Sequence, residues 1–324
     1  MDLEEEIINI FRNNFPIANG IGDDSSIIPN GDNSYYLTTQ DTLTESIHFS
    51  TKYYTPQDLA YKALAVNISD ISAMGATPKY LWNSISFPKK KASYMLQWSN
   101  FFCEFCKDTN IEVMGGNVSK SPREIQIVIT LIGVSESKYI KRINGAEDGD
   151  FILLCGNAGH AHVGLLSYEN DISCNKSLEI YQKALKRPAN RFAEGKWLAK
   201  RPQVHAMTDT SDGILPNLVR ILKQSKKSSV IEQDWFPPSY SFAKVCENLG
   251  CDPETVQLTG GEDYGLIFCV SPDMVDNIVR EFKQEFKYDL TTIGRITQNL
   301  EERIILKKHG SEKILPIDSF SHFS

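Results

Sequence analysis

An apolar helix that carries an aspartate near its end is the feature that most constrains this chain. Thr55 and Pro56 are typical of a helix N-cap and first helical position, and Gly75 is typical of a helix end. Apolar residues between them cover nearly the whole circumference, namely Leu59, Ala60, Ala63, Leu64, Ala65, Val66, Ile68, Ile71 and Met74. The helix is therefore predicted to be buried. Because a buried carboxylate is costly without a partner, we expect Asp70, which shares a face with Asn67, to meet a cation or to shift its pKa.

The length and the order of the predicted elements indicate two domains of mixed α and β structure. A chain of 324 residues exceeds what one hydrophobic core usually supports. Strands near 80–87, 125–134, 151–155 and 266–270 alternate with predicted helices. We predict an α/β fold of the α+β sandwich type. The segment 136–147 is polar and weakly patterned, so we divide the chain into domains 1–138 and 139–324.

The charge and the hydrophobic pattern exclude several classes of partner. The net charge is −7, and the sequence has no basic stripe that could bind the phosphates of a nucleic acid. No apolar run approaches the length of a membrane span, and the acidic N-terminus is unlike a signal peptide. The odd number of cysteines, seven, fits reduced thiols. We therefore expect a cytoplasmic protein with neither a nucleic-acid partner nor a membrane partner.

Acidic residues next to glycine or small polar residues recur at five element edges. These are Asp23-Asp24, Asp41, Asp70, Asp209 with Asp212, and Glu262-Asp263. Each alone fits an ordinary turn, cap or helix end. If the five converge, their repulsion requires hard divalent cations, and Mg²⁺ completes its shell with water and substrate phosphates. The pattern therefore favours several Mg²⁺ ions and a phosphate-rich substrate.

The common phosphate-binding motifs are missing from the sequence. There is no G-x-x-x-x-G-K-[ST] motif, and Gly20-Ile21-Gly22 lacks the third glycine of a dinucleotide-binding loop. The segment 156–159 has the form of a phosphate cradle at a helix start, but an ordinary strand-to-helix turn is the favoured interpretation. In an enzyme that uses ATP, metal ions would then hold the triphosphate.

The motifs, in their order, resemble the thiamine-monophosphate kinases, which belong to the aminoimidazole-ribonucleotide synthetase superfamily. The resemblance covers essentially the whole chain and is specific because the whole ordered set is present. The matching segments are Gly20–Asp24, Asp41–Leu43 with His48-Phe49, Lys62–Asp70, Gly115-Gly116, Gly145–Asp150, Asp209–Gly213 and Gly260–Tyr264.

This resemblance implies transfer of the ATP γ-phosphoryl group to thiamine monophosphate in a multi-Mg²⁺ site. It also implies a homodimer formed through the sheet of the N-terminal domain, and a C-terminal α/β domain. The implied Mg²⁺ ligands are Asp24, Thr39, Gln40, Asp41, Asp70, Asn117, Asp209 and Asp212, of which Asp41, Asp70 and Asp209 are the catalytic candidates. The implied ATP contacts are Gly116, Asn117, Arg142 and Ser211. The implied contacts to thiamine monophosphate are His48, Glu262 and Phe320.

Three positions depart from the family pattern. Asn117 stands where an aspartate is usual, Gln40 where a threonine is usual, and Gly265 where a glutamate is common. An amide oxygen keeps a ligand but loses its charge, so one metal site should be weaker. A catalytically weakened nucleotide-binding protein and another ATP-using synthetase of the superfamily stay open as alternatives. His48 also fits a purely structural hydrogen-bonding role.

Overall fold

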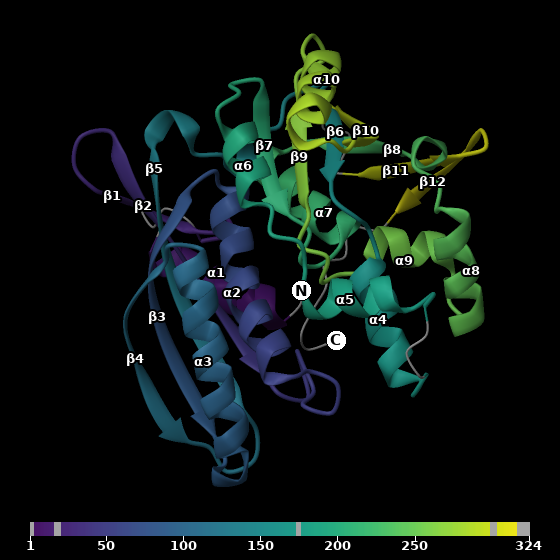
Figure 1. Ribbon diagram of the computed structural model, residues 1–324. Helices are drawn as coiled ribbons and strands as arrows, with labels where there is room; N and C mark the ends of the chain where they lie inside the picture. The colour runs from purple at the N-terminus through teal and green to yellow at the C-terminus, as the bar shows by residue number, and fades with distance from the viewer. Residues whose placement is uncertain (1–2, 16–20, 173–175, 299–302, 316–324) are drawn as a thin grey trace.

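A computed structural model describes residues 3–15, 21–172, 176–298 and 303–315 of the chain. Two sheets organise these residues, one in each half of the chain (Figure 1). The α-helices are α1 (Leu3–Asn14), α2 (Pro56–Ala73), α3 (Ala92–Asp108), α4 (His160–Glu169), α5 (Glu179–Lys186), α6 (Phe192–Ala199), α7 (Ile214–Ser225), α8 (Tyr240–Leu249), α9 (Pro253–Thr259) and α10 (Val275–Phe286). Short 3-10 turns occupy Lys89–Lys91, Ser137–Tyr139, Ile143–Gly145 and Gln233–Trp235.

The N-terminal sheet has five strands in the order β1-β2-β5-β3-β4. Its strands are β1 (Ser26–Pro29), β2 (Ser34–Thr44), β3 (Thr77–Phe87), β4 (Glu112–Lys120) and β5 (Gln126–Glu136). Figure 1 shows α2 and α3 on the same side of this sheet. Apolar residues of both helices and of the inward-facing strand positions form one buried core. The opposite face of the sheet is called the open face below.

The predicted boundaries of α2 are confirmed. The Thr55 hydroxyl accepts the Asp58 amide N–H at 3.1 Å, as an N-cap does, and Pro56 is the first helical residue. The helix ends before Gly75, whose φ of +73° favours glycine. Because α2 packs against the sheet on one side and against α5, α6 and β7 on the other, nearly all of its residues are buried.

The structure corrects one detail of the N-terminal strands and places two further predicted residues. Asp41 was predicted at the end of a strand, but β2 continues to Thr44 because it pairs with β5 over its full length. Gly116 and Asn117 lie inside β4, where they pair with Asn83 and Ser84 of β3. A strand environment fixes the directions of alternate side chains, and this matters for the site below.

The C-terminal sheet has seven strands in the order β12-β11-β8-β10-β6-β9-β7. Its strands are β6 (Phe151–Cys155), β7 (Val204–Asp209), β8 (Ser228–Glu232), β9 (Leu266–Val270), β10 (Thr291–Thr297), β11 (Ile304–Lys308) and β12 (Ser311–Leu315). Helix α7 packs on one face of the sheet and α10 on the other. The mixed α/β class is therefore confirmed. The domain division at 138/139 stays a prediction, with β5 ending at Glu136 and β6 beginning at Phe151.

Helix α2 joins the two halves of the molecule. Its Ser69 hydroxyl donates to Asp209 of β7 at 2.7 Å, and Tyr61 donates to the Pro188 carbonyl at 3.1 Å. The acidic end of α2 is thus held against the end of a C-terminal strand. Within the described part of the chain, no helix is long and apolar enough to cross a membrane.

Candidate active site

Three carboxylates from distant parts of the sequence meet beside α2. Asp24 precedes β1, Asp70 lies in the last turn of α2, and Asp209 ends β7. Each offers a carboxylate oxygen within 4.8 Å of the others. Opposite oxygen ligands of an octahedral Mg²⁺ ion lie about 4.2 Å apart. The spacing of the three oxygens therefore fits ligands of a shared ion or of adjacent ions.

Neighbouring side chains orient the carboxylates of this cluster. The Arg220 guanidinium of α7 contacts Asp24 at 3.0 Å, and the Thr208 hydroxyl donates to the same oxygen at 2.9 Å. The Ser211 hydroxyl donates to Asp209 at 2.8 Å, opposite the bond from α2. The Thr39 hydroxyl donates to Asp70. These bonds fix the carboxylates in advance, so a ligand would not have to order them.

Burial and mutual repulsion raise the pKa values of Asp24 and Asp70. Burial raises the pKa of Asp24 to about 7, although Arg220 lowers it, and the Asp209 charge adds to the increase. Burial also raises the pKa of Asp70 well above its ordinary value, and the Asp41 and Asp209 charges contribute. A shift of the Asp70 pKa, one of the two outcomes expected from the sequence, is thus confirmed. The positive charge next to these carboxylates therefore does not offset the effects of burial and mutual repulsion on their ionised forms.

The cluster borders a cavity of about 790 Å³. Asp41 and Asp212 line this cavity together with Asp24 and Asp70. Burial raises the pKa of Asp41 to about 7, and the Asp209, Glu262 and Asp212 charges act in the same direction. Four of the five predicted acidic positions therefore contribute carboxylates to one place. A cavity of this size holds a drug-sized ligand.

The donor set of the cluster fits a hard divalent cation. Its ligand atoms are carboxylate oxygens, which Mg²⁺ prefers. Asp24 Oδ2 is buried and has no hydrogen-bond partner among the described residues. A buried acceptor oxygen is costly unless it accepts a hydrogen bond or binds a cation. The residues present therefore fit Mg²⁺, with Asp24, Asp70 and Asp209 as its first candidates.

The loop Gly260–Gly265 brings the fifth acidic position to the cavity in a strained backbone. Glu262 has φ +74° and Tyr264 has φ +50°, and such conformations cost roughly 1–3 kcal/mol each in non-glycine residues. Both side chains line the cavity, and Glu262 contacts Lys62 of α2. The Glu262 N–H donates to the Ser211 carbonyl at 2.6 Å, which ties the two loops together.

Asp263 does not line the acidic cavity, although its neighbour Glu262 does. Its carboxylate accepts the Ala161 N–H at 2.9 Å, at the first turn of α4. Burial raises the pKa of Asp263 to about 7, although backbone N–H groups of this helix start lower it. Asp263 is therefore a helix cap, the interpretation that each acidic position allowed when taken alone.

Gln40, Gly116 and Asn117 lie on the open face of the N-terminal sheet. The Gln40 amide donates to the Thr130 hydroxyl at 2.7 Å, while Thr39 and Asp41 point to the opposite side of β2. Gln40, Gly116 and Asn117 line a separate cavity of about 310 Å³. Strands β5 and β3 separate β4 from β2. Gln40 also lines the acidic cavity, whereas Gly116 and Asn117 do not, and the roles of all three stay predictions.

The remaining predicted contacts lie around the acidic cavity. His48 lines it, and its Nδ1 accepts the Thr44 N–H at 3.1 Å. Ser211 lines it as well, and Arg142 lies close enough to Asp23 for its charge to lower the pKa of that carboxyl, which burial raises. Phe320 lies outside the described residues.

Two cations at the site were not identified from the sequence. Arg220 lies on α7 among buried apolar residues, three residues after Asn217, to which it donates at 3.2 Å. The sequence signal that could have identified Arg220 is its position as a charged residue among the apolar residues of a helix. Lys62 lies inside a segment quoted for the resemblance, but no role was assigned to it. The acidic residues could be identified because they recur along the sequence. Arg220 and Lys62 are single cations, so no repeated pattern marked them.

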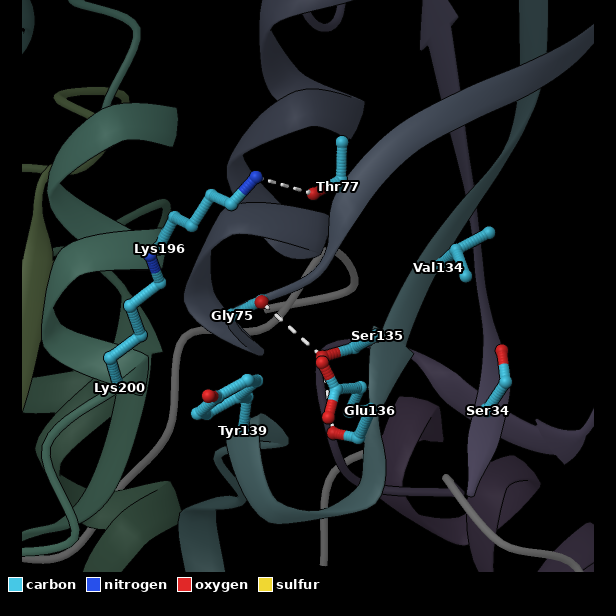
Figure 2. Close-up of a pocket in the computed structure, with 9 residues that line it drawn as sticks. All are labelled: Ser34, Gly75, Thr77, Val134, Ser135, Glu136, Tyr139, Lys196 and Lys200. Atoms are coloured by element: carbon cyan, nitrogen blue, oxygen red, sulfur yellow. Dashed lines mark hydrogen bonds between the residues drawn. The ribbon is translucent and has the colours of Figure 1, made fainter. Parts of the chain in front are cut away.

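A second hollow of about 430 Å³ lies between α6 and the strand ends of the N-terminal sheet (Figure 2). Lys196 of α6 and Lys200, which directly follows this helix, form one wall. Lys196 donates to the Thr77 hydroxyl at 3.2 Å, and the Ser135 hydroxyl donates to the Gly75 carbonyl at 3.5 Å (Figure 2). None of the predicted site residues lines this hollow. We interpret it as part of the junction between the two halves of the chain.

The fold and the acidic site define a two-domain protein of the AIR synthase related class. Residues 22–135 match the model of the AIR synthase related protein, N-terminal domain, and residues 147–307 match that of the C-terminal domain. The thiamine-monophosphate kinase of Buchnera aphidicola subsp. Schizaphis graminum is 32% identical over 310 residues, which cover 94% of this chain and 92% of that protein. The chain therefore belongs to the thiamine-monophosphate kinase family.

Solved structures agree with this assignment. The crystal structure of thiamine monophosphate kinase from Aquifex aeolicus matches with a TM-score of 0.80 and 27% identity, covering 97% of this chain and 99% of that one. A structure described as AaThiL complexed with AMPPCP and TMP matches with a TM-score of 0.82 and 27% identity, covering 97% and 98% of the two chains. The similarity thus extends over both domains.

Proposed function

We propose that this protein transfers the γ-phosphoryl group of ATP to thiamine monophosphate, giving thiamine diphosphate and ADP. The observation that carries the proposal is the convergence of Asp24, Asp70 and Asp209 beside a cavity large enough for a ligand. Family membership supports the choice of substrates, because the matched relatives are thiamine-monophosphate kinases and one matched structure contains an ATP analogue and TMP.

The reaction needs positioning more than proton transfer. An acceptor phosphate has a second pKa near ~6, so it is largely dianionic at pH 7 and needs no strong base. Its oxygen forms the new bond to the γ-phosphorus as the bond to the β–γ bridging oxygen breaks, and the leaving electrons remain on ADP. We propose a direct in-line transfer of this kind. The main obstacle is the approach of two anions.

The carboxylates of the cavity meet that obstacle by holding cations. Asp24, Asp70 and Asp209 would hold Mg²⁺, and Asp41 and Asp212 would extend the set to further ions. Bound Mg²⁺ supplies the positive charge that neutralises phosphate oxygens in the transition state. Thr39, Ser69 and Ser211 keep the carboxylates oriented. Arg142 and Ser211 would contact ATP, and His48 and Glu262 would contact the acceptor.

We also propose that the open face of the N-terminal sheet forms a homodimer interface. Trp82 on this face is 39% exposed, and Val128 and Thr130 lie next to it around the shallow cavity. A sheet face that no helix of the described residues covers and that exposes a tryptophan is a candidate interaction site. A dimer would also explain Gly116 and Asn117, because only another copy can bring these positions to an acidic cluster. A Cβ at Gly116 would meet the Asn83 backbone oxygen at 2.1 Å, so glycine is required there by packing alone.

We expect the protein to act in the cytoplasm, where ATP is available. The cysteines in the described part of the chain are free thiols, and four of the six are buried. Free thiols are typical of a reducing compartment.

A coupled assay of ADP release tests the proposed function. The wild-type chain should release ADP when thiamine monophosphate and Mg²⁺ are both present, and should release little when either is omitted. Free thiamine should be a poor acceptor because its hydroxyl would need deprotonation. ATP binding without turnover would instead identify a weakened nucleotide-binding protein, the alternative that Asn117 motivates. Equal turnover of thiamine and thiamine monophosphate would contradict the proposal.

A further inference from the structure

Lys62 places a fully buried ammonium group behind the acidic cavity. Its side chain is 0% exposed, while that of its partner Glu262 is 29% exposed and lines the cavity. Lys62 lies two helical turns before Asp70 on α2. One helix therefore presents one carboxylate to the cavity and supports a second.

The surroundings of Lys62 fix the ammonium group in one position. Its Nζ donates to the Tyr54 hydroxyl at 3.0 Å and to the Leu185 carbonyl at 3.3 Å, and its third bond goes to Glu262 Oε2. An ammonium group has three donors, so all of them are used. Tyr54 in turn donates to the Leu185 carbonyl at 3.0 Å. A buried lysine held in this way cannot follow Glu262 if that side chain moves.

Glu262 needs such an anchor for two reasons. Its backbone has a positive φ in a loop that contains a second positive-φ residue, so the loop depends on outside contacts to keep its shape. Asp41 and Tyr264 line the same cavity, where burial raises the pKa of both and the Glu262 charge adds to the increase. Without a counter-charge, repulsion would favour conformations that take Glu262 away from the other acids.

We propose that Lys62 is a positioning residue that holds Glu262 in place to bind the acceptor substrate, an inference that rests on the proposed function. Lys62 occupies Oε2 of Glu262 from behind, which leaves Oε1 to accept a hydrogen bond from a donor group of the acceptor. Lys62 itself does not touch the substrate. The pair spans α2 and the Gly260–Gly265 loop, so it also sets the distance between the acceptor position and the acidic cluster.

The test compares acceptor kinetics of Lys62→Met, Lys62→Arg and Glu262→Gln with wild type. We expect Lys62→Met to raise KM for thiamine monophosphate at least roughly tenfold while KM for ATP changes less than about twofold. Lys62→Arg should recover part of the loss, because it restores the charge. Lys244→Met is the matched control, since it removes a lysine from an exposed pair with Glu247 at 3.2 Å. The control should leave both KM values unchanged.

The double variant Lys62→Met/Glu262→Gln separates positioning from packing. If Lys62 acts through Glu262, the double variant should have an acceptor KM no higher than the worse single variant. Multiplicative effects of the two changes would overturn the inference. So would a Lys62→Met enzyme in which both KM values and kcat change to the same extent, or in which the acceptor KM is unchanged.

Failure of the proposed function would be recognised separately. A wild-type chain that turns over no thiamine monophosphate contradicts the proposed function before any variant is compared. In that case thermal unfolding still tests the pairing: the Lys62→Met chain should be stabilised by the added Glu262→Gln change, because an unpaired, partly buried charge is removed from beside the other acids. A double variant that unfolds below Lys62→Met would overturn the pairing itself.

Discussion

The two faces of the N-terminal sheet differ sharply in charge, although they share the same strands. On the side of α2, β2 presents Thr39 and Asp41 to a cavity lined with carboxylates. On the open face, the residue between them, Gln40, bonds to Thr130 near the neutral Asn117. Alternation along one strand thus separates a charged chemical site from a neutral surface.

This difference shows why neighbouring residues in a motif need not share a role. From the sequence, Thr39, Gln40 and Asp41 were predicted as one set of ligands. In the structure the Gln40 side chain points to the open face, away from the acidic cluster. Repulsion among carboxylates is confined to the covered face, where burial strengthens it. The open face carries no such strain and offers apolar contacts instead. We therefore propose phosphoryl transfer on one face and subunit contact on the other.

The largest expected effect is on the charged face. Asp70→Asn should fold but lose activity by about 10²-fold or more, because one charge is removed from a shared metal cluster. Asp32→Asn, an exposed change in the turn between β1 and β2, serves as the control and should keep wild-type activity. Steady-state ADP release at saturating Mg²⁺ measures both. Near-wild-type turnover of folded Asp70→Asn would mean that Asp70 is only a helix-end residue.

The second prediction concerns the open face. Val128→Lys places a charge in the middle of this face and should convert the proposed dimer into a monomer, because an unpaired lysine is costly to bury in an interface. Val128→Thr, which keeps the β-branched shape, should remain dimeric. Analytical ultracentrifugation of the three forms measures the change. A wild-type monomer at assay concentration would contradict the assignment of the open face.

The sequence predicted the charged face better than the open one, for physical reasons. Repeated carboxylates leave a clear pattern because each needs small neighbours, and the N-cap and glycine end of α2 are local signals. The side of the sheet on which a β4 residue lies depends on pairing with a distant strand, so the position of Asn117 had no local signal. Lys62 and Arg220 are single cations whose partners lie far away in sequence, and spacing rules do not find such pairs.

The third prediction uses the raised pKa values of the charged face. Asp24 and Asp41 have pKa values of about 7 in the folded chain against 3.8 as the ordinary value. The folded state therefore binds more protons than the unfolded state, and stability without metal should fall as pH rises from about 4 to about 7. Mg²⁺ competes with those protons, so it should raise the Tm more at pH 7.5 than at pH 5.5, by roughly 5 °C.

Thermal unfolding with chelator and with Mg²⁺ at the two pH values measures this effect. The Asp70→Asn variant makes the test more specific. Loss of one charge should raise the Tm of the metal-free protein at pH 7.5 and reduce the increase in Tm that Mg²⁺ causes. An equal gain from Mg²⁺ at both pH values would show that the acidic cluster is not where the ion binds.

The smallest expected effect links the two faces. If the partner's copy of position 117 reaches an acidic cluster, Asn117→Asp should lower the Mg²⁺ concentration for half-maximal rate by about two- to fivefold, because a full charge is added at ligand distance. The same change in the Val128→Lys background should have no effect. Titration of rate against Mg²⁺ decides this. An unchanged or higher Mg²⁺ requirement in the dimer would mean that position 117 is not a metal ligand.

The most direct test of the account follows the phosphoryl group itself. ATP labelled at the γ-phosphate is incubated with thiamine monophosphate, Mg²⁺ and either wild-type protein or Asp70→Asn, and the products are separated. The account predicts label in thiamine diphosphate with wild-type protein, dependent on Mg²⁺, and about 10²-fold less with the variant. Label found only in inorganic phosphate, or equal transfer by both proteins, would contradict the assignment of phosphoryl transfer to the acidic face.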